Sequence, residues 1–137
     1  MALKLSILGL KGKIFNDDVD MVVIPGIYGD MSINAVGRDF VHLLTTGVIY
    51  VYKGSSVVRR FLIFAGSVLS TDHEIVISVN KDCLDLAKVD KTYFTKAISR
   101  YEDLLSAATA ETDKIFFQQE IESYKKAQSL VDANYYK

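Results

Sequence analysis

Two histidines and one cysteine are the residues of this chain best suited to acid–base or nucleophilic chemistry. Histidine titrates near neutral pH, which makes His42 and His73 candidate general bases. Zinc binding typically uses paired cysteines, a second histidine within one helical turn or a His-Glu-x-x-His sequence, and none of these is present. We therefore expect both histidines to be structural or solvated, Cys83 to be a packed thiol, and no catalytic or metal site.

Other chemical signatures are equally weak. The acidic residues Asp17, Asp18 and Asp20 lack the twelve-residue loop of alternating oxygen ligands that calcium requires, so we expect a solvated turn there. Glycine-rich phosphate-binding sequences and the Gly-x-Ser-x-Gly nucleophile sequence are absent. The sequence therefore contains no recognisable residues for covalent, phosphoryl or hydride chemistry.

Charge and composition exclude further classes. The chain has 16 basic and 17 acidic residues, and Arg59-Arg60 and Lys125-Lys126 are its only adjacent basic pairs, so we expect no nucleic-acid partner. No apolar run approaches the roughly 20 residues that a membrane-spanning helix needs. The segment Met1–Ser6 alternates like a strand and lacks the features of a signal peptide, so we expect no export.

The elements that would position any site fall into two parts. All 8 glycines and the single proline lie between Gly9 and Gly66. In residues 1–87, short apolar runs alternate with turns about every 8 to 12 residues, which predicts an antiparallel β-sandwich of about ten short strands. The clearest runs are Leu3–Leu8, Lys13–Phe15, Val19–Ile24, Met31–Ile33, Phe40–Leu44, Val48–Tyr52, Val57–Phe64, Ser67–Leu69 and Ile75–Val79.

Turns are expected wherever glycine, proline or acidic clusters interrupt these runs. Binding residues often lie on exposed loops of a β scaffold, and the polar segment Asn34–Asp39 is the best candidate for such a loop. The predicted turns are Gly9–Gly12, Asn16–Asp18, Pro25–Gly26, Thr46–Gly47, Lys53–Ser55, Ala65–Gly66 and Thr71–Glu74.

Residues 88–137 show helical periodicity instead. Apolar residues recur every three or four positions from Tyr93 onward, with a break near Thr109–Thr112, which predicts an antiparallel two-helix hairpin. We expect Asp90 to cap the first helix and Thr112 to cap the second. Two such helices are marginally stable alone, so we expect the pair to dock on another surface.

Several short motifs follow one another in a specific order: Phe15-x-x-x-Val19-x-x-x-Val23-x-Pro25-x-x-x-Gly29-Asp30-Met31-x-Ile33, Gly47-Val48-Ile49, Ala65-Gly66 and Ile75-Val76-Ile77. With the helical segment after Val89-Asp90, this order resembles the epsilon subunit of the bacterial F-type ATP synthase. The resemblance covers nearly the whole chain. It implies a ten-stranded sandwich followed by a two-helix domain, in agreement with the periodicities.

The resemblance also implies a function. Such a subunit catalyses no reaction itself. Its sandwich contacts the gamma subunit and the c-ring, and through these contacts it couples rotation driven by proton flow to ATP synthesis. Its helical tail either folds beside the sandwich or extends into the alpha/beta catalytic hexamer, where it restrains ATP hydrolysis. It is peripheral to the cytoplasmic face of the bacterial inner membrane.

Two departures from the family pattern affect the expected contacts. Relatives carry a Pro-Gly-His-Ala-Pro-Leu-Leu loop, and here the corresponding residues 35–41 have lost both prolines and the histidine. Because that edge faces the c-ring in the family, the resemblance implies Asp30, Arg38 and Asp39 as c-ring contacts. Many relatives also bind ATP through the sequence Ile/Leu-Asp-x-x-Arg-Ala. Here Tyr93, three residues after Asp90, stands at the position of the arginine, so we expect weak or no ATP binding and no ATP cofactor.

The basic residues of the two predicted helices are candidates to meet acidic surfaces of the catalytic hexamer. They are Lys91, Lys96, Arg100, Lys114, Lys125 and Lys126. A solvated helix face balanced by neighbouring acidic residues is the alternative. Two other functions remain open from the residues: a free-standing β-sandwich that binds a ligand or peptide, and a small enzyme built around His42 or His73. Binding to gamma would separate the stalk subunit from both.

Overall fold

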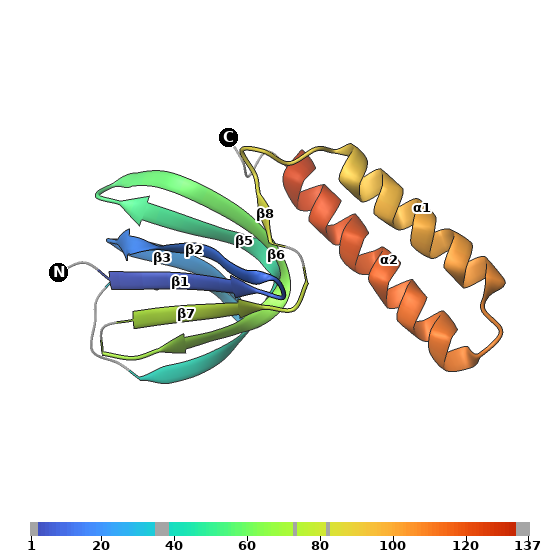
Figure 1. Cartoon of the computed structure of the whole chain (residues 1–137), viewed down its shortest axis with the longest axis horizontal. Helices are drawn as coiled ribbons and strands as arrows, with labels where there is room; N and C mark the ends of the chain where they lie inside the picture. The colour runs from blue at the N-terminus through green and yellow to red at the C-terminus, as the bar shows by residue number, and fades with distance from the viewer. Residues whose placement is uncertain (1–2, 35–38, 73, 82, 134–137) are drawn as a thin grey trace. The chain divides into compact units, whose positions relative to one another are not determined.

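The computed structural model describes residues 3–34, 39–72, 74–81 and 83–133 of the chain (Figure 1). The chain divides into two compact units, residues 1–87 and residues 88–137. The first unit is built of strands and the second of helices. Neither helix in the described part of the chain is long and apolar enough to cross a membrane.

Eight strands form a single sheet in the order β2-β1-β7-β6-β5-β3-β4, with β8 paired to β6. The pairs are antiparallel except β1 with β7. The long strands β5 and β6 bend, so that each contributes to both layers of a sandwich (Figure 1). This confirms the predicted fold, and treating the halves of β5 and β6 as separate strands accounts for the expected ten. The strands are β1 (Leu3–Gly9), β2 (Gly12–Val19), β3 (Met21–Gly26), β4 (Gly29–Ile33), β5 (Phe40–Lys53), β6 (Ser56–Ser70), β7 (Glu74–Val79) and β8 (Leu84–Asp85).

The core between the layers follows from the alternation of side chains along the strands. Successive side chains of a strand point to opposite faces, so every second apolar residue can be buried. In β1 and β7 these positions include Leu5, Ile75 and Ile77, which are almost completely buried. The bent strands add Ile49 and Phe61 to the same cluster. One apolar core therefore joins both layers.

Two of the predicted turns are wrong, because the glycines there lie inside continuous strands. Strand β5 runs through Thr46 and Gly47, and β6 runs through Ala65 and Gly66. A Cβ atom on Gly47 would collide with the ring of Pro25, and one on Gly66 would collide with the backbone oxygen of Ser78. These glycines allow neighbouring backbones to approach closely where the strands bend, a role that glycine has inside strands as well as in turns.

The acidic turn predicted at Asn16–Asp18 is also wrong, since these residues continue β2. Cross-strand pairing with β1 outweighs their low strand propensity, with Asn16 opposite Ser6 and Asp18 opposite Lys4. The turns predicted at Gly9–Gly12 and Lys53–Ser55 are confirmed, whereas Pro25 and Gly26 still belong to β3 and the turn follows at Ile27 and Tyr28. Strand β3 ends at Pro25-Gly26, and Gly54 links β5 to β6 with a φ of 63°, a left-handed conformation that glycine adopts without strain.

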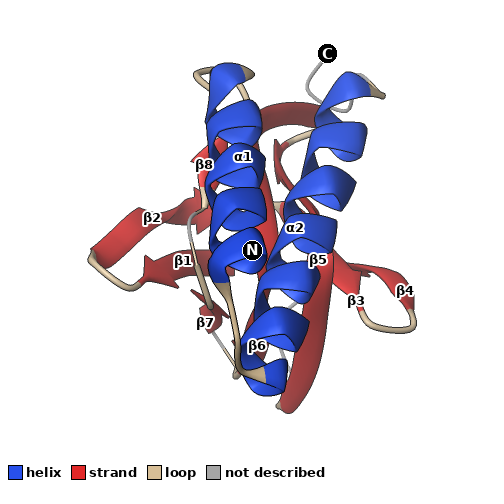
Figure 2. Cartoon of the chain, turned by 90° about the vertical axis from the view of Figure 1, so that its right-hand side faces the viewer, coloured by secondary structure: helices blue, strands red, loops and turns tan. Residues whose placement is uncertain are grey.

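The second unit is a pair of helices, α1 (Thr92–Ala107) and α2 (Glu111–Asp132), joined by a short connection and lying side by side (Figure 2). The predicted hairpin is confirmed. The Asp90 carboxylate accepts a hydrogen bond from the Thr92 amide at 3.0 Å, as a capping side chain should. Thr112 does not cap α2, because the helix has already begun at Glu111.

The close approach at Gly66 generates a stability prediction. Replacing Gly66 with alanine should lower the free energy of unfolding by about 1–3 kcal/mol, because the new methyl group must displace the backbone of β7. Urea unfolding monitored by circular dichroism measures this change. The neighbouring substitution Ser67→Ala is the control and should change it by less than about 0.5 kcal/mol. Equal stability of the two variants would contradict the packing role of Gly66.

Candidate interaction surfaces

Among the described residues, the side chains that the sequence offered for chemistry lie apart from one another: His42 is in β5 and Cys83 directly precedes β8. The described part of the chain contains no group of three or more His, Cys, Asp or Glu side chains that could hold a metal ion. His42 lies in β5, half-buried, with its ring centroid 6.2 Å from that of Tyr28. Cys83 is partly exposed and packs against the core. His73 lies outside the described residues.

An exposed apolar surface is the most prominent feature of the sheet. Val41 and Leu43 of β5 are 70% and 58% exposed, and Leu69 of β6 is 45% exposed. Val41 lies directly opposite Leu69 in the antiparallel ladder, so their side chains share the outer face of the sheet. We call these three residues the β5–β6 apolar patch. Contiguous exposed apolar residues of this kind mark sites where other proteins bind.

Sequence inspection missed this patch, although a signal was present. In the run Phe40-Val41-His42-Leu43-Leu44, apolar residues occupy both faces of the strand, whereas a sheet with one solvated face shows strict alternation. The inward-facing member Leu44 is buried, so Val41 and Leu43 must point outward. Apolar residues on both faces of this part of β5 were therefore the sequence signal of an apolar outer face.

The β3–β4 turn presents a second surface. Tyr28 is 89% exposed at the tip of this turn, and Ile27 beside it is 45% exposed. The Ile27 amide donates a hydrogen bond to the Leu43 oxygen at 3.2 Å, which ties the turn to β5. A Cβ atom on Gly26 would collide with the His42 ring and with the backbone oxygen of Gly29. The turn is therefore held closely, with its aromatic side chain projecting into solvent.

The two described residues of the expected c-ring contact, Asp30 and Asp39, lie on different elements. Asp30 is the second residue of β4, opposite Pro25 in the β3–β4 hairpin. Asp39 directly precedes β5, beyond the far end of β4. Both residues are exposed, and neither carboxylate is hydrogen-bonded or ion-paired to a described residue. Arg38 lies outside the described residues. Asp30 therefore belongs with the β3–β4 turn, and Asp39 with the start of β5.

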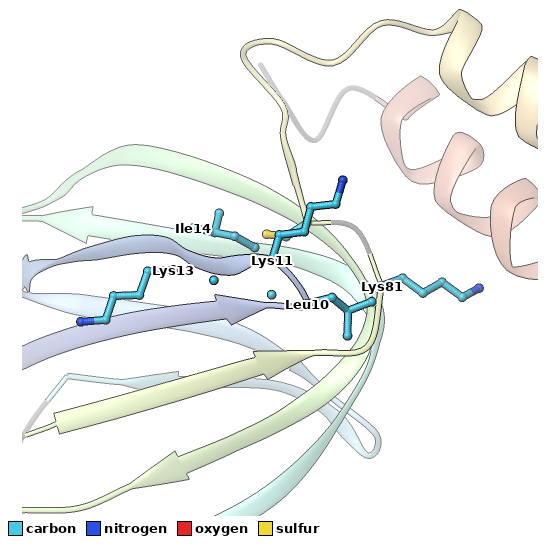
Figure 3. A pocket seen from close by; sticks show the side chains of 8 residues that line it. Leu10, Lys11, Lys13, Ile14 and Lys81 are labelled. Atoms are coloured by element: carbon cyan, nitrogen blue, oxygen red, sulfur yellow. The ribbon is translucent and has the colours of Figure 1, made fainter.

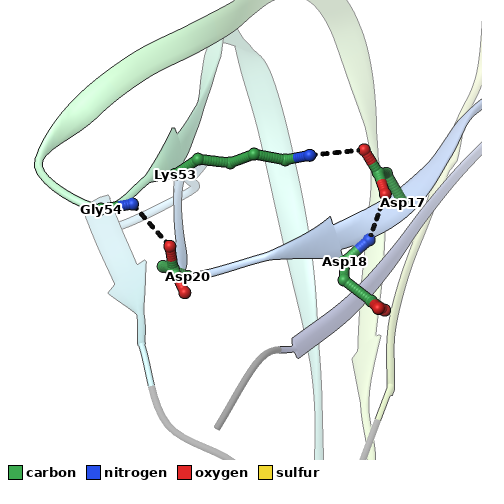
Figure 4. A network of polar contacts seen from close by, with 5 residues as sticks. All are labelled: Asp17, Asp18, Asp20, Lys53 and Gly54. Carbon is green, nitrogen blue, oxygen red and sulfur yellow. Dashed lines mark hydrogen bonds and ion pairs between the residues drawn. The ribbon is translucent and has the colours of Figure 1, made fainter.

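The acidic residues considered as metal ligands instead connect β2 and β3 to the β5–β6 turn (Figure 4). Lys53 donates a hydrogen bond to Asp17 at 2.7 Å, and the Gly54 amide donates to Asp20. The hydrogen bond from Lys53, reinforced by one from the Asp18 amide, lowers the pKa of Asp17. These contacts fasten one end of the sandwich.

A second cluster attaches the end of the strand unit to the sheet. Arg59 pairs with Asp85 at 3.0 Å, and its guanidinium lies over the ring of Phe61 at 4.9 Å from the centroid. Phe15 packs edge-on against Phe61 at 5.7 Å. The pair holds β8 against β6, so Leu84 and Asp85 are part of the sheet.

One hollow, of about 270 Å³, lies at the β1–β2 turn (Figure 3). Leu10, Ile14 and Cys83 contribute to its lining together with three lysines. The lysine side chains extend in different directions rather than toward one point (Figure 3). A small-molecule site needs polar groups that converge on the ligand, so this hollow lacks the geometry of a ligand site.

The basic residues predicted on the helices divide into two groups. Lys91 pairs with Asp132 at 3.7 Å, and Lys114 pairs with Glu111 at 3.9 Å. Arg100 places its guanidinium 5.9 Å from the centroid of the Tyr101 ring. The other three, Lys96, Lys125 and Lys126, are exposed on the helices. Exposed ion pairs contribute little stability, so most of these charges remain available to a partner.

The segment with the degenerate ATP-binding pattern lies at the start of α1, and its side chains make contacts within the helical unit. The hydrogen bond from the Thr92 amide lowers the pKa of Asp90, so its carboxylate is occupied with the first turn of α1. Tyr93 packs against Phe94 and Tyr124, with ring centroids 5.3 Å and 6.1 Å away. Tyr93 is half-buried, and its neutral ring does not offer the charge-assisted contacts that arginine makes with phosphate.

Comparison of the sequence with known proteins assigns the strand unit to a family. Residues 2–82 match the family model of the ATP synthase Delta/Epsilon chain, beta-sandwich domain, which covers more than half of the chain. The chain belongs to the ATP synthase delta/epsilon family. The match coincides with the strand unit, and it confirms the resemblance inferred from the motifs.

Curated relatives agree with this family assignment. The ATP synthase epsilon chain of Rhodospirillum rubrum is 28% identical over 101 residues, which are 74% of this chain and 75% of the relative. The ATP synthase epsilon chain of Aliarcobacter butzleri is 43% identical over 54 residues, 39% of this chain and 43% of the relative. The similarity to the Rhodospirillum rubrum protein therefore extends over about three quarters of this chain.

Solved structures show the same fold at low sequence identity. A chain of the Euglena gracilis mitochondrial ATP synthase, from a structure of OSCP/F1/c-ring in rotational state 1, superposes with a TM-score of 0.70 at 18% identity. The alignment covers 97% of this chain and 81% of that chain. A chain of the Tetrahymena thermophila mitochondrial ATP synthase central stalk/c-ring superposes with a TM-score of 0.57 at 14% identity, covering 93% and 97%.

The contact between Asp17 and Lys53 predicts a specific pH dependence. Because the folded-state pKa of Asp17 is lowered from its ordinary value of 3.8, this carboxylate contributes stability above pH 3.8, and the contribution disappears as the pH falls further. The wild type should therefore be more stable than Asp17→Asn at pH 7, and the difference should shrink below about pH 3.8. Chemical denaturation across this range measures it. Asp18→Asn is the control; an equal loss at pH 7 would contradict a specific role for Asp17.

Proposed function

We propose that this chain is the epsilon subunit of an F-type ATP synthase central stalk, a non-catalytic subunit that couples rotation of the c-ring to ATP synthesis. The observation that supports this most strongly is the family match over residues 2–82, which coincides with a sandwich whose outer face is apolar and exposed. A subunit that transmits rotation needs rigid binding surfaces rather than reactive groups. The continuous core and the tied ends of the sandwich supply that rigidity.

The gamma subunit is the partner that we propose for the β5–β6 apolar patch. Val41, Leu43 and Leu69 offer aliphatic side chains on a flat sheet face, which suits a stable interface better than a transient one. Asp39 lies two residues before Val41, at the border of the patch, where we keep it as a proposed c-ring contact together with Asp30 and Arg38. Charged residues contribute specificity at such a rim while the apolar centre excludes water.

The c-ring is the partner that we propose for the β3–β4 turn. This turn combines the exposed Tyr28 ring with the exposed Asp30 carboxylate, and hydrogen bonding to β5 holds it in place. An aromatic ring beside a carboxylate suits a loop that carries arginine or lysine, through cation–π and charge-assisted contacts. Contacts with gamma and with the c-ring would then use different parts of the sandwich. The chain would be peripheral to the cytoplasmic face of the bacterial inner membrane.

The helical unit is the part that we propose to restrain ATP hydrolysis. It is a compact unit separate from the sandwich, so it can move without disturbing the rotor contacts. Its exposed basic residues, including Lys96, Arg100 and Lys125, would meet acidic surfaces of the alpha/beta hexamer. We propose that ATP does not bind, because Tyr93 occupies the place of the phosphate-binding arginine.

Reconstitution with gamma tests the proposed stalk role. Val41→Lys or Leu43→Lys should lower the amount of chain that co-purifies with gamma at least tenfold, because a charge would be buried in the apolar interface. Val58→Lys is the matched control, since Val58 is 43% exposed outside the patch, and it should bind like the wild type. Wild-type failure to bind gamma would contradict the stalk role, whereas equal binding by all variants would contradict only the assignment of the patch.

Truncation tests the proposed restraint of hydrolysis. A chain that ends after Lys88 keeps the complete sandwich core, so it should still assemble with gamma. ATP hydrolysis by the assembled complex should then rise severalfold, because the helices can no longer enter the hexamer. The measurement is the steady-state hydrolysis rate of complexes that contain the full or the truncated chain. A normal assembly with unchanged hydrolysis would show that the tail is not inhibitory.

A further inference from the structure

We propose that a ladder of aromatic rings latches α1 to α2, so that the tail stays a closed hairpin without any bound nucleotide. Four rings from alternate helices form the ladder: Tyr93 and Tyr101 from α1, and Phe117 and Tyr124 from α2. The latch itself depends only on these contacts. Its consequence for the regulation of hydrolysis rests on the proposed function.

The ladder crosses the hairpin three times. Tyr93 meets Tyr124 with ring centroids 6.1 Å apart, Tyr124 stacks on Tyr101 at 5.8 Å with an interplanar angle of 25°, and Tyr101 meets Phe117 at 6.1 Å. All three separations lie within the range in which aromatic pairs attract one another beyond simple burial. Each ring between the two ends therefore contacts two rings of the opposite helix.

Helix geometry explains why these rings align. Tyr93 and Tyr101 are eight residues apart on α1, and Phe117 and Tyr124 are seven apart on α2, so both spacings are close to two helical turns. Each helix thus presents its pair of rings on one face. Tyr124 is only 8% exposed, and its neighbours Ile121 and Ala127 are also buried. The other three rings are half-buried, so the ladder runs along the seam between the helices with Tyr124 as its most buried ring.

The open end of the hairpin has an additional contact. Lys91, immediately before α1, pairs with Asp132 at the end of α2 at 3.7 Å. This pair is exposed and adds little stability by itself. It nevertheless joins the ends of the helices that lie farthest from the α1–α2 connection. Covalent connection, aromatic ladder and ion pair therefore hold the hairpin along its whole length.

The position of Tyr93 separates this latch from control by a nucleotide. Its ring is the first rung of the ladder, at the place where the sequence pattern expected an arginine for phosphate. The same residue cannot both pack in the helix seam and bind an anion in water. The closed hairpin is thus stabilised by side chains of the chain itself. In the assembled enzyme, the tail would move as a closed pair unless the ladder is broken.

Hydrogen exchange of the full chain tests the latch, with Tyr101 as the variable position. Tyr101→Ala should speed exchange of the slow amides in residues 92–132 at least tenfold, because the ring contacts two rings of the other helix. Tyr101→Phe keeps the ring and should exchange like the wild type. Tyr101→Leu keeps an apolar side chain of similar reach and should lie between the two. Amides of the sandwich should be unaffected in every variant.

Phe116→Ala is the matched control, since Phe116 is 51% exposed and its one ring contact among the described residues is with its neighbour Phe117 in α2. It should leave exchange in α1 unchanged. Hydrogen exchange of Tyr101→Leu at the wild-type rate would overturn the aromatic latch. Equal increases in exchange for Tyr101→Ala and Phe116→Ala would also overturn it. Slower hairpin exchange with millimolar ATP would show that a nucleotide closes the hairpin, and would also overturn it. None of these outcomes depends on binding to gamma.

Discussion

The close backbone approach at Gly47 and Gly66 is the constraint on which the rest of the strand unit depends. Because neither residue has a side chain, β5 can pass over Pro25 and β6 can pass over the backbone of β7. The two strands therefore bend without ending, and they stay paired on both sides of Ala65. Ala65 itself has a φ of 129°, a strained conformation for a residue with a side chain. The surrounding pairing maintains that strain.

Both proposed rotor contacts follow from this bend. The first half of β5 lies in one layer and exposes Val41 and Leu43, while the β3–β4 turn is fastened to the same strand at Leu43. A continuous strand fixes these two surfaces relative to each other within the sandwich. The Asp17–Lys53 contact and the Arg59–Asp85 pair then hold the ends of the long strands. A rigid unit of this kind suits a part that must transmit torque.

The helical unit solves a different physical problem. The contact that distinguishes this helix pair from other amphipathic pairs is the aromatic ladder along the seam. Aromatic rings combine a large apolar area with preferred contact geometries, so they specify one pairing of helices better than flexible aliphatic residues do. A mobile inhibitory element needs such an internal specification, because its surroundings change when it moves.

The sequence by itself determined the class of fold, the two-helix tail and the family. Alternation of period two and helical period arise from local geometry, and the order of the motifs is a property of the sequence alone. Only the tertiary structure decided what the glycines at positions 47 and 66 do, since a turn and a close approach use the same residue. It likewise exposed the β5–β6 apolar patch and brought Tyr101 between Phe117 and Tyr124. These features depend on contacts between residues far apart in the chain, which local patterns do not encode.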